Sequence, residues 1–395
     1  MTSTKVFLGT MISCLAFGAG FEQELMWSGK SVGTASAVSS TVEGPEALYF
    51  NPAGMLTKKS SDEISVNISY LRSQFKAPVN APDVSEKSKV GNDIVAAILY
   101  THQIDEKLAF GIGLFPSGGL SVKYDDYPTT GGVSGAPKVN LQIIELSPGI
   151  AYQVTPEFSL GLAYRITYAT ADFAVLDPAN SVFVDFKKMK GFDFSSFRLG
   201  AQYKTQDWGM GLTIRTPALI KVKGSADFTA PGPTNLSDDS AKISTTFPLT
   251  VALGSHYKVN PNLTLMFEYD FLYYKQVDDL NISTSLPLPN QDLKWKNGHV
   301  FRLGGDYDLN GTHIRAGYIF ETAIANPDTM VPTTEAPGPG HLFTVGTGFK
   351  IADNAEFNAS LFYGIGVKNV TSTTALSGKY TTSGIGLHTG VNWSF

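Results

Sequence analysis

Segments in which apolar side chains alternate with small or polar ones recur from Asp62 to the end of the chain. Each spans about ten residues, and a period of two is the pattern of a β-strand whose two faces meet different surroundings. The clearest example is residues 158–170, and the same division recurs in residues 263–273 and 301–308. Such segments predict either a membrane β-barrel, with the apolar face toward lipid, or a soluble β-protein, with that face buried.

The connections between these segments distinguish the two architectures, because long and short connections alternate along the chain. Six are short and turn-like, at residues 104–107, 155–157, 205–207, 260–262, 310–311 and 352–354. Seven are long, at about residues 76–91, 117–138, 174–191, 221–240, 278–297, 323–340 and 368–379. An up-and-down barrel with both termini on the periplasmic side needs one more outer loop than inner turn. The pattern therefore predicts an all-β, 14-stranded antiparallel transmembrane β-barrel.

Composition also favours a membrane barrel. Charged residues make up 16% of the chain and aromatic residues 12%, whereas ordinary soluble domains carry about 25% charged residues. Beyond the N-terminal segment there is no apolar run of about 18 residues, the length needed by a membrane-spanning helix. The net charge of -5 offers no basic face for nucleic acid.

Residues 1–19 read as a secretory signal peptide. Lys5 precedes an apolar run from Val6 to Phe17, and small residues follow it. An alternative is a lipoprotein acylated at Cys14, although so short a preceding segment suits this poorly. Because Cys14 is the single cysteine, the mature chain is expected to carry no disulfide.

Residues 20–56 carry neither strand alternation nor a helical stripe and are rich in small residues. Ordering each residue costs about 1–2 kcal/mol of backbone entropy, so a segment of this kind does not fold alone. We expect it to fold as a hatch inside a barrel made by residues 57–395. Eight-stranded barrels are filled by side chains, and barrels of about sixteen strands leave an aqueous channel. A plugged barrel of intermediate size predicts a selective transporter instead of a sieve.

Several short stretches resemble one family of membrane barrels. The hatch ends in Asn51, Pro52, Ala53 and Gly54, a turn-forming cluster just before the first strand. Other matching stretches are residues 20–21, 28–29, 35–37, 47–50, 110–116, 158–168, 208–212 and the last fifty residues. Together they resemble the FadL-type family of outer-membrane transporters for long-chain fatty acids and other hydrophobic compounds, whose members typically carry an Asn-Pro-Ala motif here.

The resemblance implies a monomer in the outer membrane of a Gram-negative bacterium, with a hydrophobic ligand site in the lumen. It also implies passive, ligand-gated diffusion and a lateral exit near a distorted third strand, here about Lys107–Pro116. Gly111 and Gly113 weaken pairing there, and Pro116 removes a ladder donor. The glycines can equally relieve crowding against the hatch. The hatch residues expected near the ligand are Phe21, Leu25, Met26 and Trp27.

Charged side chains on the inward face are further candidates. They are Arg165, Arg198, Arg215, Arg302, Arg315, Glu145, Glu268, Asp270, Asp306 and Glu356. Most are expected to form ion pairs that tie strands to the hatch. Arg165 or Arg315 can instead hold a substrate carboxylate in a bidentate contact. Fatty-acid carriers of the family place a basic residue late in strand five, where this chain has Thr170, and the difference favours a neutral substrate.

Two other functions are open alternatives: a non-specific porin and an outer-membrane barrel enzyme. The six histidines are scattered, and none stands beside a nucleophile motif: His102, His256, His299, His313, His341 and His388. No metal-ligand spacing and no phosphate-binding glycine loop are present in the sequence. We therefore expect neither a catalytic site, nor a metal, nor a cofactor.

The chain end and the loops suggest membrane partners. Phe395 follows Trp393 by two residues and resembles the terminal signal read by the barrel insertion machinery, or it completes an aromatic girdle. Acidic residues in the long loops are candidates for binding divalent cations that bridge lipopolysaccharide, or form a solvated rim. They are Asp83, Glu86, Asp125, Asp126, Asp238 and Asp239.

Overall fold

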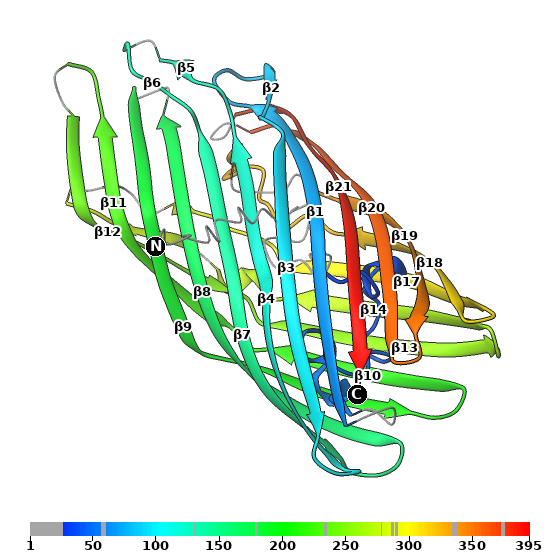
Figure 1. Cartoon of the computed structure of the whole chain (residues 1–395). Coiled ribbons are helices and arrows are strands. Elements are labelled where there is room, and N and C mark those ends of the chain that lie inside the picture. Colours follow the sequence, from blue (N-terminus) through cyan, green and yellow to red (C-terminus); the bar gives the residue numbers. More distant parts are fainter. Residues whose placement is uncertain are drawn as a thin grey trace, which may run out of the picture.

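The computed structural model describes residues 27–56, 61–129, 131–177, 181–232, 235–277, 279–285, 288, 291–333, 338–372 and 376–395. These residues form an all-β closed barrel of strongly tilted strands (Figure 1). The wall strands are β1 (Asp62–Pro78), β3 (Gly91–Gln103), β4 (Leu108–Lys123), β7 (Lys138–Gln153), β8 (Phe158–Asp177), β9 (Val182–Lys204), β10 (Trp208–Arg215) with β11 (Ala218–Thr229), β12 (Asn235–Phe247) with β13 (Thr250–Asn260), β14 (Leu263–Leu272), β17 (Gly298–Leu309), β18 (Thr312–Glu321), β19 (Gly340–Ala352), β20 (Ala355–Val370) and β21 (Gly378–Ser394).

Every wall strand pairs antiparallel with its neighbours. The last strand closes the barrel, because β21 pairs with β1 from Ser394–Glu63 to Thr381–Lys76. When the pairs β10/β11 and β12/β13 are each counted as one strand, the described residues make fourteen strands, which confirms the predicted fold class.

Smaller elements lie at the outer end and in the lumen. The short strands are β2 (Ser85–Lys87), β5 (Tyr127–Pro128), β6 (Ser134–Gly135), β15 (Asp279–Ser283) and β16 (Gln291–Asp292). The helices are η1 (Val32–Thr34), α1 (Ala47–Phe50), η2 (Pro52–Met55) and η3 (Tyr274–Gln276). None of these described helices is long and apolar enough to cross a membrane.

The apolar face of the alternating segments points outward. Leu265, Phe267 and Leu303 are 48%, 42% and 54% exposed, whereas the inward-facing Glu268 and Arg302 are buried. A soluble sandwich would bury the first set and expose the second. The alternation therefore directs the apolar side chains outward, as in a barrel wall surrounded by lipid.

All six predicted short turns occur at the end of the barrel that carries the C-terminus. Three of the predicted loops, residues 117–138, 174–191 and 221–240, are wrong in extent. β4 continues to Lys123, into the first of them. β8 continues to Asp177 and β9 starts at Val182, while β11 continues to Thr229. The ladder extends beyond the bilayer because it needs only backbone groups, and polar side chains there pair across strands, as Lys187 does with Asp227 at 2.6 Å.

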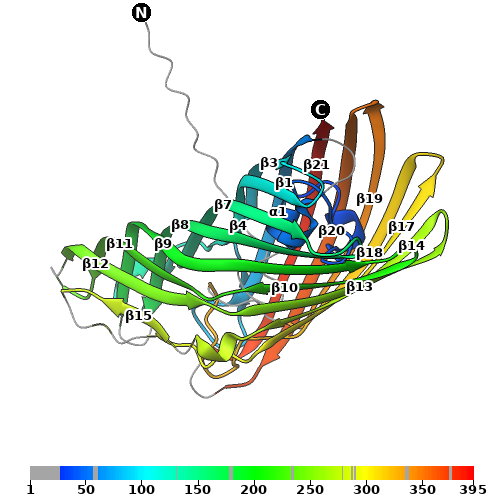
Figure 2. The same ribbon diagram turned by 90° about the horizontal axis from the view of Figure 1, so that it is seen from below.

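The hatch lies inside the barrel, as Figure 2 shows for its helix α1. Among residues 27–56, Glu43 is the one exposed residue. Glycines of the wall allow the close approach: a Cβ at Gly161 would lie 2.2 Å from the Pro52 carbonyl carbon, and one at Gly211 would lie 2.1 Å from the Ser39 oxygen. Residues 20–26 of the expected hatch, and the expected signal peptide, lie outside the described residues.

Candidate functional site

The motif at the end of the hatch joins it to the wall. The buried Asn51 side chain donates through Nδ2 to the carbonyl oxygens of Ser39 at 2.8 Å and of Ala201 on β9 at 3.0 Å. Its Oδ1 accepts from the Ala53 N–H at 3.1 Å and so caps η2, whose first residue, Pro52, has no N–H that would need an acceptor. One asparagine thus shapes the hatch and fixes it to β9.

Wall side chains also hold the hatch backbone at separate places. On one side, Arg198 donates to the Leu48 carbonyl at 2.8 Å, and Thr213 donates to the Phe50 carbonyl at 2.9 Å. Farther around the wall, on β17, Arg302 donates to the Ala35 carbonyl at 3.1 Å. Because the short turns of the hatch leave many of its carbonyl groups without a backbone partner, these contacts supply the partners that buried backbone requires.

A buried charge cluster lies beside the hatch. The Glu145 carboxylate accepts from Arg165 Nε at 2.9 Å and from Arg198 Nη1 at 2.9 Å, and the three side chains are at most 1% exposed. The guanidinium groups of Arg198 and Arg215 lie 5.1 and 4.9 Å from the ring centre of Tyr49. Charge pairing and cation–π contact compensate the loss of water around these groups.

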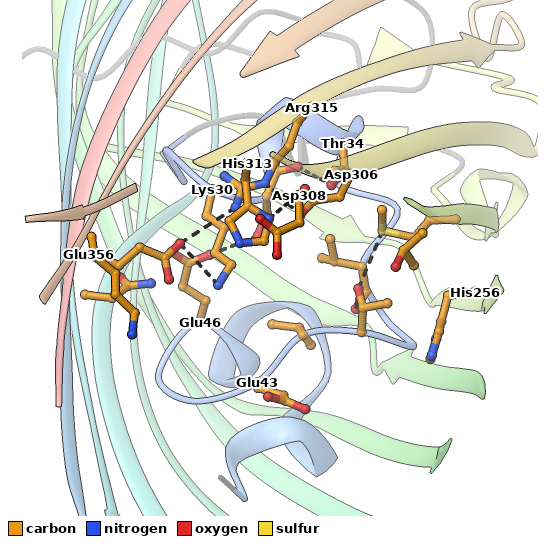
Figure 3. Close-up of a pocket in the computed structure, with 18 of the residues that line it drawn as sticks. Lys30, Thr34, Glu43, Glu46, His256, Asp306, Asp308, His313, Arg315 and Glu356 are labelled. Carbon is orange, nitrogen blue, oxygen red and sulfur yellow. Dashed lines mark hydrogen bonds and ion pairs between the residues drawn. The ribbon is translucent and has the colours of Figure 1, made fainter. Parts of the chain in front are cut away.

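Arg315 occupies a different, polar space at the turn end of the barrel. Its Nε lies 3.0 Å from Asp306 Oδ2, and its Nη1 donates to Asn358 Oδ1 at 2.6 Å. It lines a cavity of about 990 Å³ between the hatch and the turns, which we call the vestibule. Figure 3 shows its charged and polar lining, including Lys30, Glu43, Glu46, His256, Asp306, Asp308, His313, Arg315 and Glu356.

A second, smaller cavity of about 100 Å³ lies in the outer half of the lumen, and we call it the apolar pocket. Trp295 and Tyr274 pack edge to face there, with ring centres 5.4 Å apart. No side chain among the described lining residues is charged: Val139, Leu141, Ala171, Phe173, Ile220, Val222, Ile243, Thr245, Thr246, Phe247, Tyr274, Leu280, Leu293 and Trp295. None of these was a candidate from the sequence, although Trp295, an apolar residue in a polar predicted loop, was a usable signal.

The third wall strand is distorted. β4 pairs with β3 only from Ala109–Gln103 to Leu114–Ile98, and among the described residues the next link is the Lys89 N–H to the Lys123 carbonyl at 2.7 Å. Residues 115–120 are buried on both faces, and the β4–β7 register shifts between Pro116 and Gly118. The outer half of β4 therefore bends into the lumen and leaves an interval without ladder pairs, the β3–β4 break.

The inward bend brings an aromatic side chain onto the hatch. Phe115 stacks on Trp27 with ring centres 5.7 Å apart and lies 5.2 Å from the Tyr49 ring. Trp27 and Phe115 are each 1% exposed. The start of the described hatch is thus packed directly against the distorted strand.

Comparison with known proteins identifies the family that has this architecture. The family model described as outer membrane protein transport protein (OMPP1/FadL/TodX) matches residues 9–395. The chain belongs to this family. Its members are outer-membrane transport proteins for hydrophobic compounds, so the chain is an outer-membrane β-barrel of a transporter family.

Individual relatives of the family are distant in sequence. Outer membrane protein P1 of Haemophilus influenzae is 22% identical over 71% of this chain and 67% of its own. The 47 kDa outer membrane protein of Pasteurella multocida is 22% identical over 93% of this chain and 94% of its own.

Solved structures share the fold. A Pseudomonas aeruginosa FadL homologue has a TM-score of 0.82 at 16% identity, covering 95% of this chain and all of its own. The Pseudomonas putida toluene transporter TodX has a TM-score of 0.74 at 17% identity, covering 97% of this chain and 99% of its own.

The site residues suggested by the family resemblance are dispersed. Phe21, Leu25 and Met26 lie outside the described residues, and Trp27 lies at the β3–β4 break. Arg165 lies in the charge cluster, and Arg315 lies in the vestibule. Gly111 faces the hatch, where an added Cβ would lie 2.9 Å from Met55 Sδ, and Gly113 faces Phe115 at the same distance.

Proposed function

We propose that this member of the family carries uncharged hydrophobic small molecules across the outer membrane by passive, ligand-gated diffusion. The observation that carries the proposal is the apolar pocket above a plugged lumen. A water-filled pore offers an apolar solute no favourable contact, whereas an apolar site recovers about 0.8 kcal/mol per buried methylene. The hatch blocks the direct aqueous route, which leaves binding as the way through.

The size of the pocket favours a compact ligand. Cavities of roughly 150 Å³ lined by apolar side chains stay dry and bind molecules the size of benzene. At about 100 Å³, the apolar pocket fits one small ring or part of an alkyl chain. Trp295 and Tyr274 offer ring edges and faces for an aromatic ligand.

The placement of the arginines favours an uncharged ligand over a fatty acid. Arg165 is engaged by Glu145, and Arg315 lines the vestibule; neither lines the apolar pocket. A carboxylate in the pocket would lose its hydration without gaining a cationic partner among the described lining residues. In this proposal the two arginines stabilise the wall and the vestibule.

The proposed exit is sideways through the β3–β4 break. The vestibule below the hatch is lined by charged groups, so it offers an apolar molecule no favourable contacts. The break instead opens beside Trp27 and Phe115, so a small movement of the hatch frees a passage toward lipid. Exit into the membrane keeps the ligand out of water throughout.

The test compares two ligands on the purified barrel in lipid vesicles. We expect saturable binding and uptake of toluene to exceed those of oleate, and Trp295→Ala to weaken toluene binding by about tenfold, which corresponds to about 1.4 kcal/mol. Trp208→Ala, at an exposed position of β10, is the matched control. Oleate bound in preference to toluene would overturn the proposed ligand class.

The exit is tested by tethering. Ala96→Cys with Pro116→Cys places cysteines on the two strands at the break, and Ile98→Cys with Leu114→Cys places them on the last intact ladder pair. We expect oxidation of the first pair to stop uptake and oxidation of the second to leave it unchanged. Equal uptake by both oxidised variants would contradict a β3–β4 exit.

A further inference from the structure

The wall has a second interval without ladder pairs, between β9 and the strand formed by β10 and β11. β9 pairs with β10 from Lys204 to Arg198 and with β11 from Lys190 outward. Between these stretches, no ladder pair joins residues 192–196 to residues 217–220, all of which the structure describes. The strands meet at both ends of this interval, because the Thr216 N–H donates to the Phe197 carbonyl at 3.0 Å and a Cβ at Gly191 would lie 1.8 Å from the Lys221 carbonyl oxygen. We call this interval the β9–β11 break.

Two local features produce the break. Pro217 separates β10 from β11, and proline supplies no N–H for a ladder and restricts Thr216 before it. On the facing strand, the β8–β9 register shifts between Arg165 and Thr167, so that two outward-facing residues, Phe194 and Ser195, stand opposite the single Ile166. The shift is a β-bulge, a feature that re-aims strands and commonly stands beside functional sites.

The backbone at the bulge is compensated by side chains. The Tyr164 hydroxyl donates to the Phe194 carbonyl, and the Ser195 and Ser196 hydroxyls donate to the Asp193 carboxylate at 2.6 and 2.8 Å. Because unpaired backbone groups are costly in lipid, the Tyr164 contact supplies a partner to a carbonyl that the interrupted ladder leaves without one.

The break lies where the outer surface of the wall changes character. Phe192 and Phe194 are 57% and 59% exposed, with ring centres 5.7 Å apart. Lys190, two residues farther outward on β9, and Lys221 on the facing strand are exposed as well. Aromatic rings next to lysines mark the boundary between hydrocarbon and head groups. The break therefore opens at the outer interface of the membrane.

On the lumen side, the break borders the apolar pocket. Ile220 and Val222 of β11 stand at its edge, are each 4% exposed, and line that pocket. The β3–β4 break lies elsewhere, against the hatch residues. The two intervals thus connect different parts of the lumen to the lipid.

From this arrangement we propose that the β9–β11 break is an entry portal, through which uncharged apolar molecules dissolved in the outer leaflet pass sideways into the apolar pocket. This inference rests on the proposed function and adds a route that does not depend on the outer loops or on movement of the hatch. Apolar compounds concentrate in the membrane, so a side portal draws on a larger local supply than an opening toward water.

The experiment tethers the break in the full-length barrel, with Cys14→Ser in every variant. Ser195→Cys with Leu219→Cys places thiols on exposed positions of the two strands, to be joined by oxidation or by a short bifunctional thiol reagent. Met210→Cys with Tyr203→Cys, an exposed and directly paired couple on β10 and β9, is the control. Toluene is preloaded in the vesicle membrane, and its transfer to the bound state is followed by tryptophan fluorescence.

We expect the joined break variant to load about tenfold more slowly than its reduced form and the control pair to load equally in both forms. Equal loading by the joined and reduced break variant overturns the portal. If the thiols do not join, labelling by a diazirine-bearing alkylbenzene decides: adducts on residues 192–196 or 217–220 support the portal, and adducts confined to the rest of the barrel overturn it. Absence of toluene binding by the unmodified barrel would instead defeat the proposed function itself.

Discussion

The vestibule and the apolar pocket are both enclosed by inward-facing side chains of one barrel, yet their linings are opposite. The vestibule, at the turn end, is large and lined by lysines, arginine and carboxylates. The apolar pocket, in the outer half, is small and has no charged side chain among its described lining. The lumen is therefore not one polar channel but two layers with the hatch beneath the apolar one, and transport of an apolar ligand concerns the outer layer.

The largest expected effect on ligand binding comes from reversing the polarity of one layer. Val222→Asp places a carboxylate in the apolar pocket, and we expect toluene binding to weaken by at least about a hundredfold, equivalent to about 3 kcal/mol. Thr264→Asp, which adds the same group to the vestibule, is expected to leave binding unchanged. Isothermal titration in detergent measures both. If the two variants lose affinity equally, the contrast between the layers does not govern ligand choice.

The next effect concerns the charges that separate the layers. Glu145→Gln leaves Arg165 and Arg198 buried with weaker partners, and breaking a buried ion pair typically costs about 3–5 kcal/mol. We expect a large fall in the urea concentration at the midpoint of unfolding, which is measured by the change in mobility on cold gels. Glu106→Gln, in an exposed turn, should change the midpoint little. A Glu145→Gln barrel as stable as the parent would show that the cluster contributes no net stability.

A smaller effect is expected from loosening the hatch. Asn51→Ala removes the side-chain bonds to the Ser39 and Ala201 carbonyls, and each buried polar group left without a partner costs about 1–3 kcal/mol. The hatch should then leave its place more often, and steady current in planar bilayers should rise above the low level of the parent. Asn369→Ala, on the outer part of β20, provides the comparison. A parent barrel with a large steady current would favour a porin.

The smallest effect is predicted within the vestibule. Lys30 lies 3.6 Å from Glu356, and their side chains are 41% and 25% exposed. Ion pairs this accessible to water contribute about 0.2–1 kcal/mol and are screened by salt. Lys30→Met should shift the urea midpoint slightly at low ionic strength and not at high. A shift as large as that of Glu145→Gln would mean that the vestibule charges behave as if buried.

The strand pattern predicted the wall but not the outer layer of the lumen. All six turns were predictable because they lie where alternation stops at Asn, Asp, Gly or, at residues 155–157, Pro. β11 was taken for a loop because its alternation is reversed: Ile220 and Val222 face inward, and Lys221 and Lys223 face outward. Beyond the bilayer the surroundings of the wall are water, so the outer end of the barrel buries its apolar side chains as a soluble protein does.

The candidate site was harder to predict than the fold. Inward parity identified the charged residues correctly as lumen groups, since Glu145, Arg165 and Arg315 all face inward and are buried. Parity does not say at which height a residue lies, and height decides whether it meets the hatch, the vestibule or the pocket. Trp295 and Tyr274 reach the pocket from segments beside η3 and β16, whose paths no local pattern in the sequence specifies.

The seam between β1 and β21 carries a consequence for assembly. The hatch directly precedes β1, and β21 completes the wall by pairing with that same strand. The hatch is also bound to separate parts of the wall, through Leu48 to β9 and through Ala35 to β17. A closed cylinder would have to reopen to admit the hatch, so we expect the leading peptide to be enclosed at the moment when β21 pairs with β1 and seals the barrel.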